Sequence, residues 1–596
     1  MYLDSAIYMK KSHFMQTLYL QKPLLLILLI ATLSTLPWIG LSDFYTKGEP
    51  REAALAVSMI EKGEWVIPSS YADEFAYKPP LNHWLIAGFS LVLTKGEVTP
   101  FTSRLPSTLA FIAMIGVCFM FFARRRPVLE AFISCLILIT CFEIHRAAMT
   151  TRVDMVLTFF LVAGLIQMYT WYEKRRAEQM ILAWLLLSLA TLAKGPVGIL
   201  LPCMIFGIYL LLQKENFFKA TLKCIILGLP ALIIPFIWYY AAYEIKGDAF
   251  FDRVFYENVG RFLHMQAADM NAQYELGHEG PFWIYLVYLA SGLLPWAILL
   301  VVSLFFLKYK MPQASAKQVL LNIYNKIMSM DKMLLFSLCV VVISLVFYSI
   351  PISKRSVYIM LVYPFIAIFM ARFFVYLSEF KPKSVRISTS ILVGIGILAL
   401  SITGLAYTGI INIEELGQNL SKRERTLRDI KVFSDMFINP GGFGLFGVVI
   451  LICAIVNSIY LLNKKMNVKI LMAGFGVMLA INMFLDSYLL QGFKNSYSPR
   501  PFAEKLSEKY DLEGNVYVTN NLERYRNLYG LNFYLHNNFK NIKLEQPEKG
   551  FFVTIGQNIE GIKEEHSNYE FTLLESSDKM NDNKDEMLFF KIEKKE

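Results

Sequence analysis

The sequence predicts a polytopic all-α membrane protein with a small α/β domain at its C-terminal end. Of its 596 residues, 55% are hydrophobic and only 18% are charged, and the mean hydropathy is +0.44. These values lie outside the range of ordinary soluble domains. The apolar residues also gather in blocks of about 18 to 25 residues with few charges, the length that a helix needs to cross a bilayer. Basic residues are concentrated in every second connection between these blocks, as in a multi-pass bundle.

The apolar blocks, taken in order, predict about thirteen transmembrane helices. They start near residues 23, 102, 128, 153, 180, 196, 222, 282, 333, 355, 386, 441 and 468. Lys10, Lys11 and Lys22 precede the first block, as in a signal peptide, but no A-x-A-like cleavage site follows it. We therefore interpret this block as an uncleaved first span.

The charged connections predict the orientation of the bundle. The basic ones are Lys10–Lys11, Arg124–Arg126, Lys174–Arg176, Lys214–Lys223, Lys308–Lys332, Lys381–Arg386 and Lys464–Lys469. The positive-inside rule places these loops in the cytoplasm. The outward set is then residues 41–101, 146–152, the turn near Lys194, 244–281, 351–356, 411–440 and the tail after about residue 490. One kinked helix around Gly195, in place of two spans, would invert everything downstream.

We expect two domains, a transmembrane part over residues 1–495 and a soluble outer-face domain over residues 496–596. The tail contains one helix-like stretch at 501–510 and strand-like runs at 515–518, 551–555, 569–574 and 587–592. The large outer loops are residues 41–101 and 244–281.

Charge and cysteine usage exclude two other classes of function. The net charge of +10 does not indicate a nucleic-acid partner, because the Lys and Arg residues lie between apolar blocks and form no stripe on a soluble domain. All seven cysteines fall inside apolar blocks, and no C-x-x-C pair occurs. The sequence thus indicates neither a disulfide framework nor a thiolate metal site.

The first outer loop carries a candidate base and a candidate phosphate ligand. Pro50 near the start and Gly63 past the end of an amphipathic pattern predict an interfacial helix. Glu49 stands at the positive end of that helix, where it could act as a base or be only a helix-start acid. Two prolines stiffen the backbone after Lys78, whose ammonium could hold a lipid phosphate or extend toward water.

Further acids and cations lie on the predicted outer side. An acid such as Asp154, just inside an apolar run, needs a partner or a task, and Arg152 is one possible partner. Lys194 and Lys354 oppose the positive-inside bias. Together these groups suggest a pocket for a membrane-embedded donor linked to phosphate.

The 244–281 loop adds polar residues but no complete metal site. It contains Arg253, Asn258, Arg261, His264, His278 and Glu279. A lone His is more often structural than a ligand, and a metal at His278 would need further ligands.

Seven motifs follow one another along the chain. They are GEPREAALAVSMIEKGEWVIP (48–68), YKPPLNHW (77–84), RLPS (104–107), RVDM (152–155), AKGPVG (193–198), NVGRFL with HEGPFW (258–263 and 278–283) and ISKRSVYIMLVYP (352–364). In this order they resemble the motifs of bacterial integral-membrane C-type glycosyltransferases, the group of the lipid A aminoarabinose transferases and the protein O-mannosyltransferases. The resemblance covers roughly the first ten spans.

The resemblance implies a fold, a reaction and a place. The fold would have a dozen or more spans, amphipathic helices in the first outer loop and a periplasmic C-terminal domain in the bacterial inner membrane. The reaction would move a sugar from a polyprenyl phosphate, such as an undecaprenyl phosphate, to an acceptor with inversion and without a nucleotide sugar. The acceptor, whether lipid A, a surface glycan or a protein, and the identity of the sugar stay open.

The resemblance also implies residue roles. Lys78 and Lys354 would hold the donor phosphate, and an acid of the first outer loop together with Asp154 would serve catalysis. The other residues that would line the substrate site are Arg51, Arg152, Lys194, Arg261 and Tyr358.

Two positions depart from the family pattern. Gly48 occupies the place of the first acid of the acidic pair in the family's first-loop motif, so Glu49 is the nearest carboxylate and is slightly favoured as base. Tyr77 occupies the place of the Glu that precedes the lysine in E-K-P-P. No cofactor is required, and this second departure weakens the case for the divalent metal that some members bind.

A transporter or flippase of lipid-linked glycans is the alternative function. Transporters tend to place charged sites near the midplane of the membrane, between inverted repeats. Here the unusual charges gather at one face and no repeat is visible, which favours the enzyme.

Overall fold

The computed structural model describes most of the chain. The described residues are 22–46, 48–71, 74–260, 279–308, 315–420, 424–438, 441–464, 466–519, 526–556, 559–577 and 586–595. Helices dominate residues 22–496, and a five-stranded sheet follows. This confirms the predicted fold class.

Each of the predicted spans coincides with a helix or with a bent helix. Eight helices among the described residues are long and apolar enough to cross a membrane, or eleven spans if each of three bent pairs counts as one. The straight spans are α5 (Pro100–Ala123), α8 (Val153–Lys174), α9 (Ala177–Lys194), α17 (Lys332–Ser349), η4 (Ser356–Leu361) with α18 (Val362–Phe380), α19 (Pro382–Tyr407), α22 (Gly444–Lys464), and α23 (Asn467–Phe484) with η5 (Leu485–Leu489) and α24 (Leu490–Ser496).

The bent and short helices account for the other predicted spans. The bent pairs are α6 (Val128–Thr140) with α7 (Phe142–Ala148), α11 (Phe217–Ala231) with α12 (Ile233–Lys246), and α14 (Ile284–Gly292) with α15 (Trp296–Leu304). The short apolar helices α2 (Pro23–Thr35) and α10 (Val197–Leu212) match the remaining two predicted starts.

Shorter elements fill the connections. They are α3 (Gly48–Glu61), β1 (Ser69–Tyr71), β2 (Glu74–Phe75), α4 (Leu81–Leu93), α13 (Asp248–Phe255), the π-helix η2 (Tyr256–Gly260), α16 (Ala316–Met328), α20 (Ile413–Leu420) and α21 (Glu424–Ile438). Helix α3 is the amphipathic helix predicted for the first outer loop, and ten of its residues are buried.

The chain reverses direction at Gly195, so α9 and α10 are two spans and not one kinked helix. Gly195 has a φ of +92°, a conformation that favours glycine, and α9 packs against α10. Close packing also requires Gly198, because a Cβ there would lie 2.3 Å from the Thr191 nitrogen. Two separate helices here agree with the span count from the sequence, and the sides on which the downstream loops lie stay a prediction.

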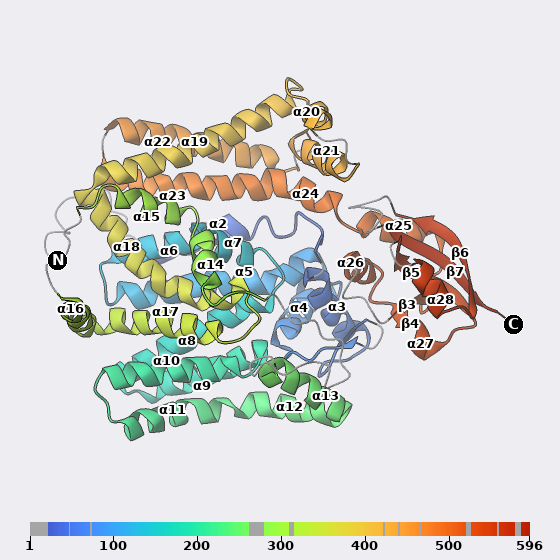
Figure 1. Cartoon of the computed structure of the whole chain (residues 1–596), viewed down its shortest axis with the longest axis horizontal. Helices are drawn as coiled ribbons and strands as arrows, with labels where there is room; N and C mark the ends of the chain where they lie inside the picture. Colours follow the sequence, from blue (N-terminus) through green and yellow to red (C-terminus); the bar gives the residue numbers. More distant parts are fainter. Residues whose placement is uncertain are drawn as a thin grey trace.

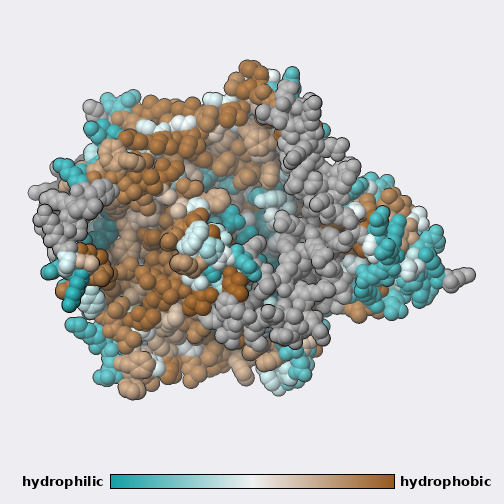
Figure 2. Space-filling model, viewed as in Figure 1, coloured by the Kyte–Doolittle hydropathy of each residue, from teal (hydrophilic) through white to brown (hydrophobic). Residues whose placement is uncertain are grey.

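Apolar side chains cover the outside of the bundle as well as its core. Exposed examples are Leu229, Ile233 and Ile237 on α11 and α12, and Leu445, Val449 and Val456 on α22. Figure 2 shows hydrophobic residues over the bundle, whereas hydrophilic residues are frequent over the C-terminal sheet. Such an apolar exterior fits a lipid environment, where the exposed side chains meet hydrocarbon.

The C-terminal segment forms a mixed sheet in the order β4-β3-β5-β7-β6. Its elements are α25 (Arg500–Lys509), β3 (Val516–Val518), α26 (Arg526–Tyr534), β4 (Phe539–Asn541), α27 (Ile542–Glu545), β5 (Lys549–Ile555), α28 (Ile559–Glu565), β6 (Tyr569–Ser576) and β7 (Met587–Lys594). Strand β3 is parallel to β4 and β5, and β7 is antiparallel to β5 and β6. The sequence predicted four of these strands and missed β4, which has only three residues.

The C-terminal sheet lies at the end of the bundle that carries α3 (Figure 1). The Asn532 side chain donates to the Ser70 carbonyl at 2.8 Å, and the Phe44 backbone N–H donates to the Tyr534 hydroxyl at 3.0 Å. Helix α26 packs on α3. The segment after residue 496 and the predicted first outer loop therefore share one end of the molecule.

Candidate active site

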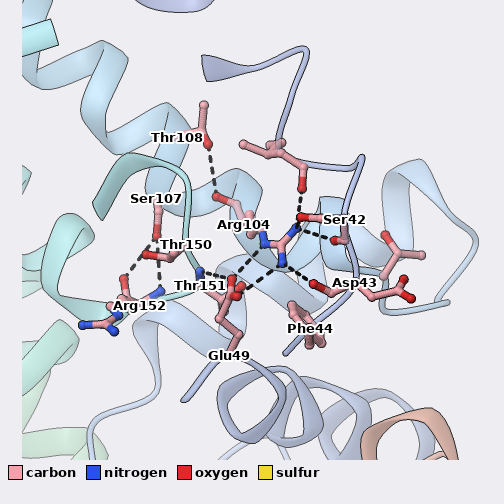
Figure 3. A network of polar contacts seen from close by, with 12 residues as sticks. Ser42, Asp43, Phe44, Glu49, Arg104, Ser107, Thr108, Thr150, Thr151 and Arg152 are labelled. Carbon is pink, nitrogen blue, oxygen red and sulfur yellow. Dashed lines mark hydrogen bonds and ion pairs between the residues drawn. The ribbon is translucent and has the colours of Figure 1, made fainter. Parts of the chain in front are cut away.

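A buried arginine organises the first outer loop. Arg104, near the start of α5, is 1% exposed. Its guanidinium donates to Glu49 through Nε, to Oε1 at 2.8 Å, and through Nη2, to Oε2 at 3.3 Å. It also donates to the carbonyls of Ile39, Ser42 and Asp43 (Figure 3). All these acceptors lie on the segment between α2 and α3, or on α3 itself, so Arg104 fixes the entry to the helix.

Glu49 also reaches the segment before α8. The Thr151 backbone N–H donates to Glu49 Oε1 at 3.0 Å (Figure 3). Glu49 is 3% exposed, and both of its oxygens accept from Arg104. Removing one partner of such a buried pair costs about 3–5 kcal/mol, since the other charge is left uncompensated. Glu49 therefore has the surroundings of a structural acid. Neither of its oxygens is left to act as a base.

One turn further along α3, Glu52 holds a second cluster. Its Oε1 accepts from Lys78 Nζ at 3.0 Å and lies 3.4 Å from Arg51 Nη2, while its Oε2 lies 2.7 Å from His83 Nε2. Lys78 precedes α4, and His83 lies in the first turn of that helix. Because Cβ atoms three apart share a helix face, Glu49 and Glu52 both point away from solvent into the fold.

Both first-loop acids are ionised at neutral pH. Burial alone would raise the pKa of Glu49, but the charge and hydrogen bonds of Arg104 outweigh it and lower that pKa below the ordinary value of 4.5. Burial also acts to raise the pKa of Glu52, but the charge of Lys78 and the hydrogen bond of His83 outweigh it. They lower that pKa well below the ordinary value. The stability that these pairs contribute is present above pH 4.5 and is lost as the pH falls through the lowered pKa values.

The third acid, Asp154, lies at the start of α8. Its Oδ1 accepts from Lys194 Nζ, which comes from the end of α9. The Lys194 ammonium also lies 4.4 Å from the centre of the Tyr358 ring. The charges of Arg152 and Lys78 act on the Asp154 carboxylate as well. Asp154 is thus paired with Lys194 and not with Arg152, the structural partner considered from sequence.

Asp154 differs from both glutamates in how its oxygens are used. Oδ1 is engaged by Lys194, whereas Oδ2 makes no hydrogen bond with the described residues. In Glu49 and Glu52, by contrast, each oxygen has a partner at 3.3 Å or less. Among these three acids, Asp154 alone therefore has an oxygen ready to accept a proton.

Lys354 contacts neither Lys78 nor Lys194 among the described residues. It is 4% exposed, and its Nζ donates to the Pro351 carbonyl. Burial lowers its pKa. Two residues that follow Lys354 are close to Lys194. The charge of Arg355 acts on Lys194, and the Tyr358 ring lies beside the Lys194 ammonium.

The structure brings most of the predicted site residues together, and two of the predicted residues are not among those that it describes. Glu49, Arg51, Lys78, Arg152, Asp154, Lys194 and Tyr358 belong to adjoining clusters. Arg261 and His278 lie outside the described residues. Among the described residues, no group of three His, Cys, Asp or Glu side chains is arranged to hold a metal ion.

Sequence reasoning gave no role to His83 and did not connect Glu52 with Lys78. His83 is fully buried and lies 31 positions from its partner Glu52. A histidine one turn into a helix that follows Lys-Pro-Pro was the available signal. The position of this histidine in the sequence does not indicate which acid its side chain contacts.

The comparisons with known proteins agree with the motifs. Residues 77–240 match the sequence family described as Dolichyl-phosphate-mannose-protein mannosyltransferase. Over 363 residues the chain is 24% identical to the undecaprenyl phosphate-alpha-4-amino-4-deoxy-L-arabinose arabinosyl transferase 2 of Proteus mirabilis. That match spans 59% of this chain and 59% of the relative, so the chain aligns with less than two thirds of that protein's length.

The solved structures extend the likeness to almost the whole chain. The crystal structure of ArnT from Cupriavidus metallidurans bound to undecaprenyl phosphate is similar with a TM-score of 0.66 at 16% identity. It covers 95% of this chain and 97% of that one. The chain therefore has the fold of ArnT. The likeness extends over 95% of the chain, and at 16% identity it shows the fold alone.

A relative of unassigned activity belongs to the same set. An uncharacterized protein of Aquifex aeolicus is 29% identical over 353 residues, which is 56% of this chain and 76% of that protein. Likeness to these proteins does not by itself assign a sugar or an acceptor, because function resides in the site and not in the fold.

Proposed function

We propose that this protein is an inverting glycosyltransferase that moves a sugar from a polyprenyl-phosphate donor, such as an undecaprenyl phosphate, to an acceptor at the outer face of the bacterial inner membrane. The acceptor belongs to the class of lipid A, surface glycans or proteins. The relatives' names support the reaction class, since the Proteus mirabilis protein is an undecaprenyl phosphate-aminoarabinose transferase.

One observation carries the proposal. Lys78 and Lys194 are held at one end of the bundle by carboxylates, and the charge of Lys78 acts on Asp154, the partner of Lys194. An ammonium group paired with Asp154, and a second whose charge reaches that carboxylate, suit the phosphodiester of the donor beside a proton acceptor. Neither cation lies on a soluble face where a solvated charge would be expected.

The proposed mechanism assigns the base to Asp154. Its free Oδ2 takes the proton of the acceptor, and the acceptor oxygen forms a bond to the anomeric carbon of the sugar. The bond from that carbon to the phosphate oxygen breaks at the same time, and the polyprenyl phosphate leaves with the electron pair. Lys78 and Lys194 stabilise the charge that gathers on the leaving phosphate, so no general acid is needed.

This assignment revises the slight preference for Glu49 that rested on the sequence motifs. In the proposed mechanism Glu49 is a positioning residue. It joins Arg104 to the backbone N–H of Thr151, three residues before Asp154. Lys354, Arg152, Tyr358 and Arg51 keep their proposed place in the substrate site, and no metal is assigned a step.

Purified protein with a synthetic undecaprenyl phosphate sugar tests the proposal. We expect release of undecaprenyl phosphate that depends on an added acceptor extract, and a mass shift of one sugar on the acceptor. Comparing the masses of lipid A and of surface glycans from cells with and without the gene identifies the acceptor. Donor that crosses vesicles without being consumed would instead support a transporter.

The proposed orientation has its own test. The alternating basic loops place the C-terminal sheet outside and the 308–332 connection, which contains α16, inside. A reporter fused after Glu596 should therefore be active only in the outer compartment, and one inserted between residues 308 and 332 only in the cytoplasm. The opposite result for the tail would place the proposed site on the wrong side for an outer-face acceptor.

A further inference from the structure

A carboxylate meets the side chain of Lys78 from a distant segment. Glu52 lies 26 positions before Lys78 and is carried by α3, whereas Lys78 stands at the entrance to α4. The Lys78 side chain is 24% exposed, and that of Glu52 is 7% exposed. The lysine therefore lies at the edge of the cluster with its charged end directed by a buried acid.

His83 fixes the other side of Glu52. Its ring is fully buried, its Nε2 lies 2.7 Å from Glu52 Oε2, and its Nδ1 is buried without a hydrogen-bond partner among the described residues. Burying the Nδ1 atom without a hydrogen-bond partner costs free energy, because that atom loses its contact with water. The contact between Nε2 and Glu52 is the polar interaction that offsets this cost. The contact leaves Glu52 little freedom to turn away from Lys78.

The sequence explains why such an arrangement is needed in this chain. In the motif that YKPPLNHW resembles, a Glu precedes the lysine, and here that place is taken by Tyr77. The carboxylate that contacts Lys78 in this chain comes instead from Glu52 on α3.

Tyr77 has cations around its ring. The Arg253 guanidinium lies 4.5 Å from the centre of the Tyr77 ring, and Lys78 Nζ lies 5.8 Å from it. Two cations thus flank a neutral ring at the position where the motif has a carboxylate.

We infer that Glu52, held by His83, is a positioning residue for Lys78 and supplies from α3 the carboxylate that position 77 no longer provides. This inference rests on the proposed function, because it gives Lys78 the donor phosphate as its ligand. Glu52 does not touch the reacting atoms. It sets where the Lys78 ammonium stands when the phosphate binds.

The experiment measures binding of undecaprenyl phosphate to the purified full-length protein in detergent. Glu52→Gln should raise the dissociation constant about tenfold, since the lysine loses its fixed, charge-assisted partner. Tyr77→Glu in the same chain should restore binding to within about threefold of wild type. Glu61→Gln, at the exposed end of the same helix, is the matched control and should bind as wild type does.

A double-mutant cycle separates positioning from a general structural effect. If Glu52 acts through Lys78, then Glu52→Gln should change binding by less than about twofold once Lys78 is already Met. An undiminished effect in the Lys78→Met background, or wild-type binding by Glu52→Gln, would overturn the inference. If Lys78→Met itself binds as wild type does, the phosphate site of the proposed function is wrong instead. If the Glu52→Gln protein does not fold, His83→Gln takes its place in the experiment. We expect the same weakening of undecaprenyl phosphate binding and the same dependence on Lys78.

Discussion

Asp154→Asn should lower the rate of sugar transfer by at least about 100-fold, the usual scale for loss of a general base. The substitution keeps the shape of the side chain and removes the one carboxylate oxygen of the cluster that makes no hydrogen bond with the described residues. Binding of undecaprenyl phosphate should survive, because Lys194 is then freed from its acid and keeps its charge. Single-turnover transfer and lipid binding are the two measurements.

Glu173→Gln is the matched control for this variant. Glu173 lies on the same helix, α8, and pairs with Arg125 at the other end of the span. It should transfer at the wild-type rate. Wild-type turnover by Asp154→Asn would remove this residue as base and return the role to a first-loop acid, with Glu49→Gln as the next variant to measure.

Lys78→Ala should reduce transfer at limiting donor by between about tenfold and 1,000-fold. The reason is that this ammonium is the only charged group of the stiff Lys-Pro-Pro segment, and its partner Glu52 remains as a buried anion that repels the phosphate. Lys78→Arg should recover part of the activity, since a planar fork replaces a point charge. The kinetic constants for the donor, measured for both variants, check the expectation.

Lys95→Ala controls for charge at the opposite end of α4, where Lys95 is exposed. It should leave the donor KM unchanged. Full activity of Lys78→Ala at limiting donor would show that the phosphate lies elsewhere, with Lys194 and Lys354 the remaining candidates.

The site was partly predictable from sequence. Lys78, Asp154 and Lys194 were recognisable because cations on the outer side, and an acid inside an apolar run, are unfavourable without a task. Glu49 was recognisable as a helix-start acid, but the position of an acid in a helix gives no information about what closes over it. Arg104, 55 positions away, turns Glu49 into one half of a buried pair.

The order and the approximate number of the spans, the amphipathic helix α3 and four of the five strands of the C-terminal sheet were determined by the sequence alone. These features depend on local properties, namely the length of an apolar run, its period and the residues that end it. Tertiary structure alone decided the pairings of the charged groups: Glu49 with Arg104, Glu52 with Lys78 and His83, and Asp154 with Lys194. A buried charge is stable only beside a partner, and which partner it meets depends on how separate helices pack. That packing is why Asp154, and neither glutamate, retains a carboxylate oxygen without a hydrogen-bond partner among the described residues.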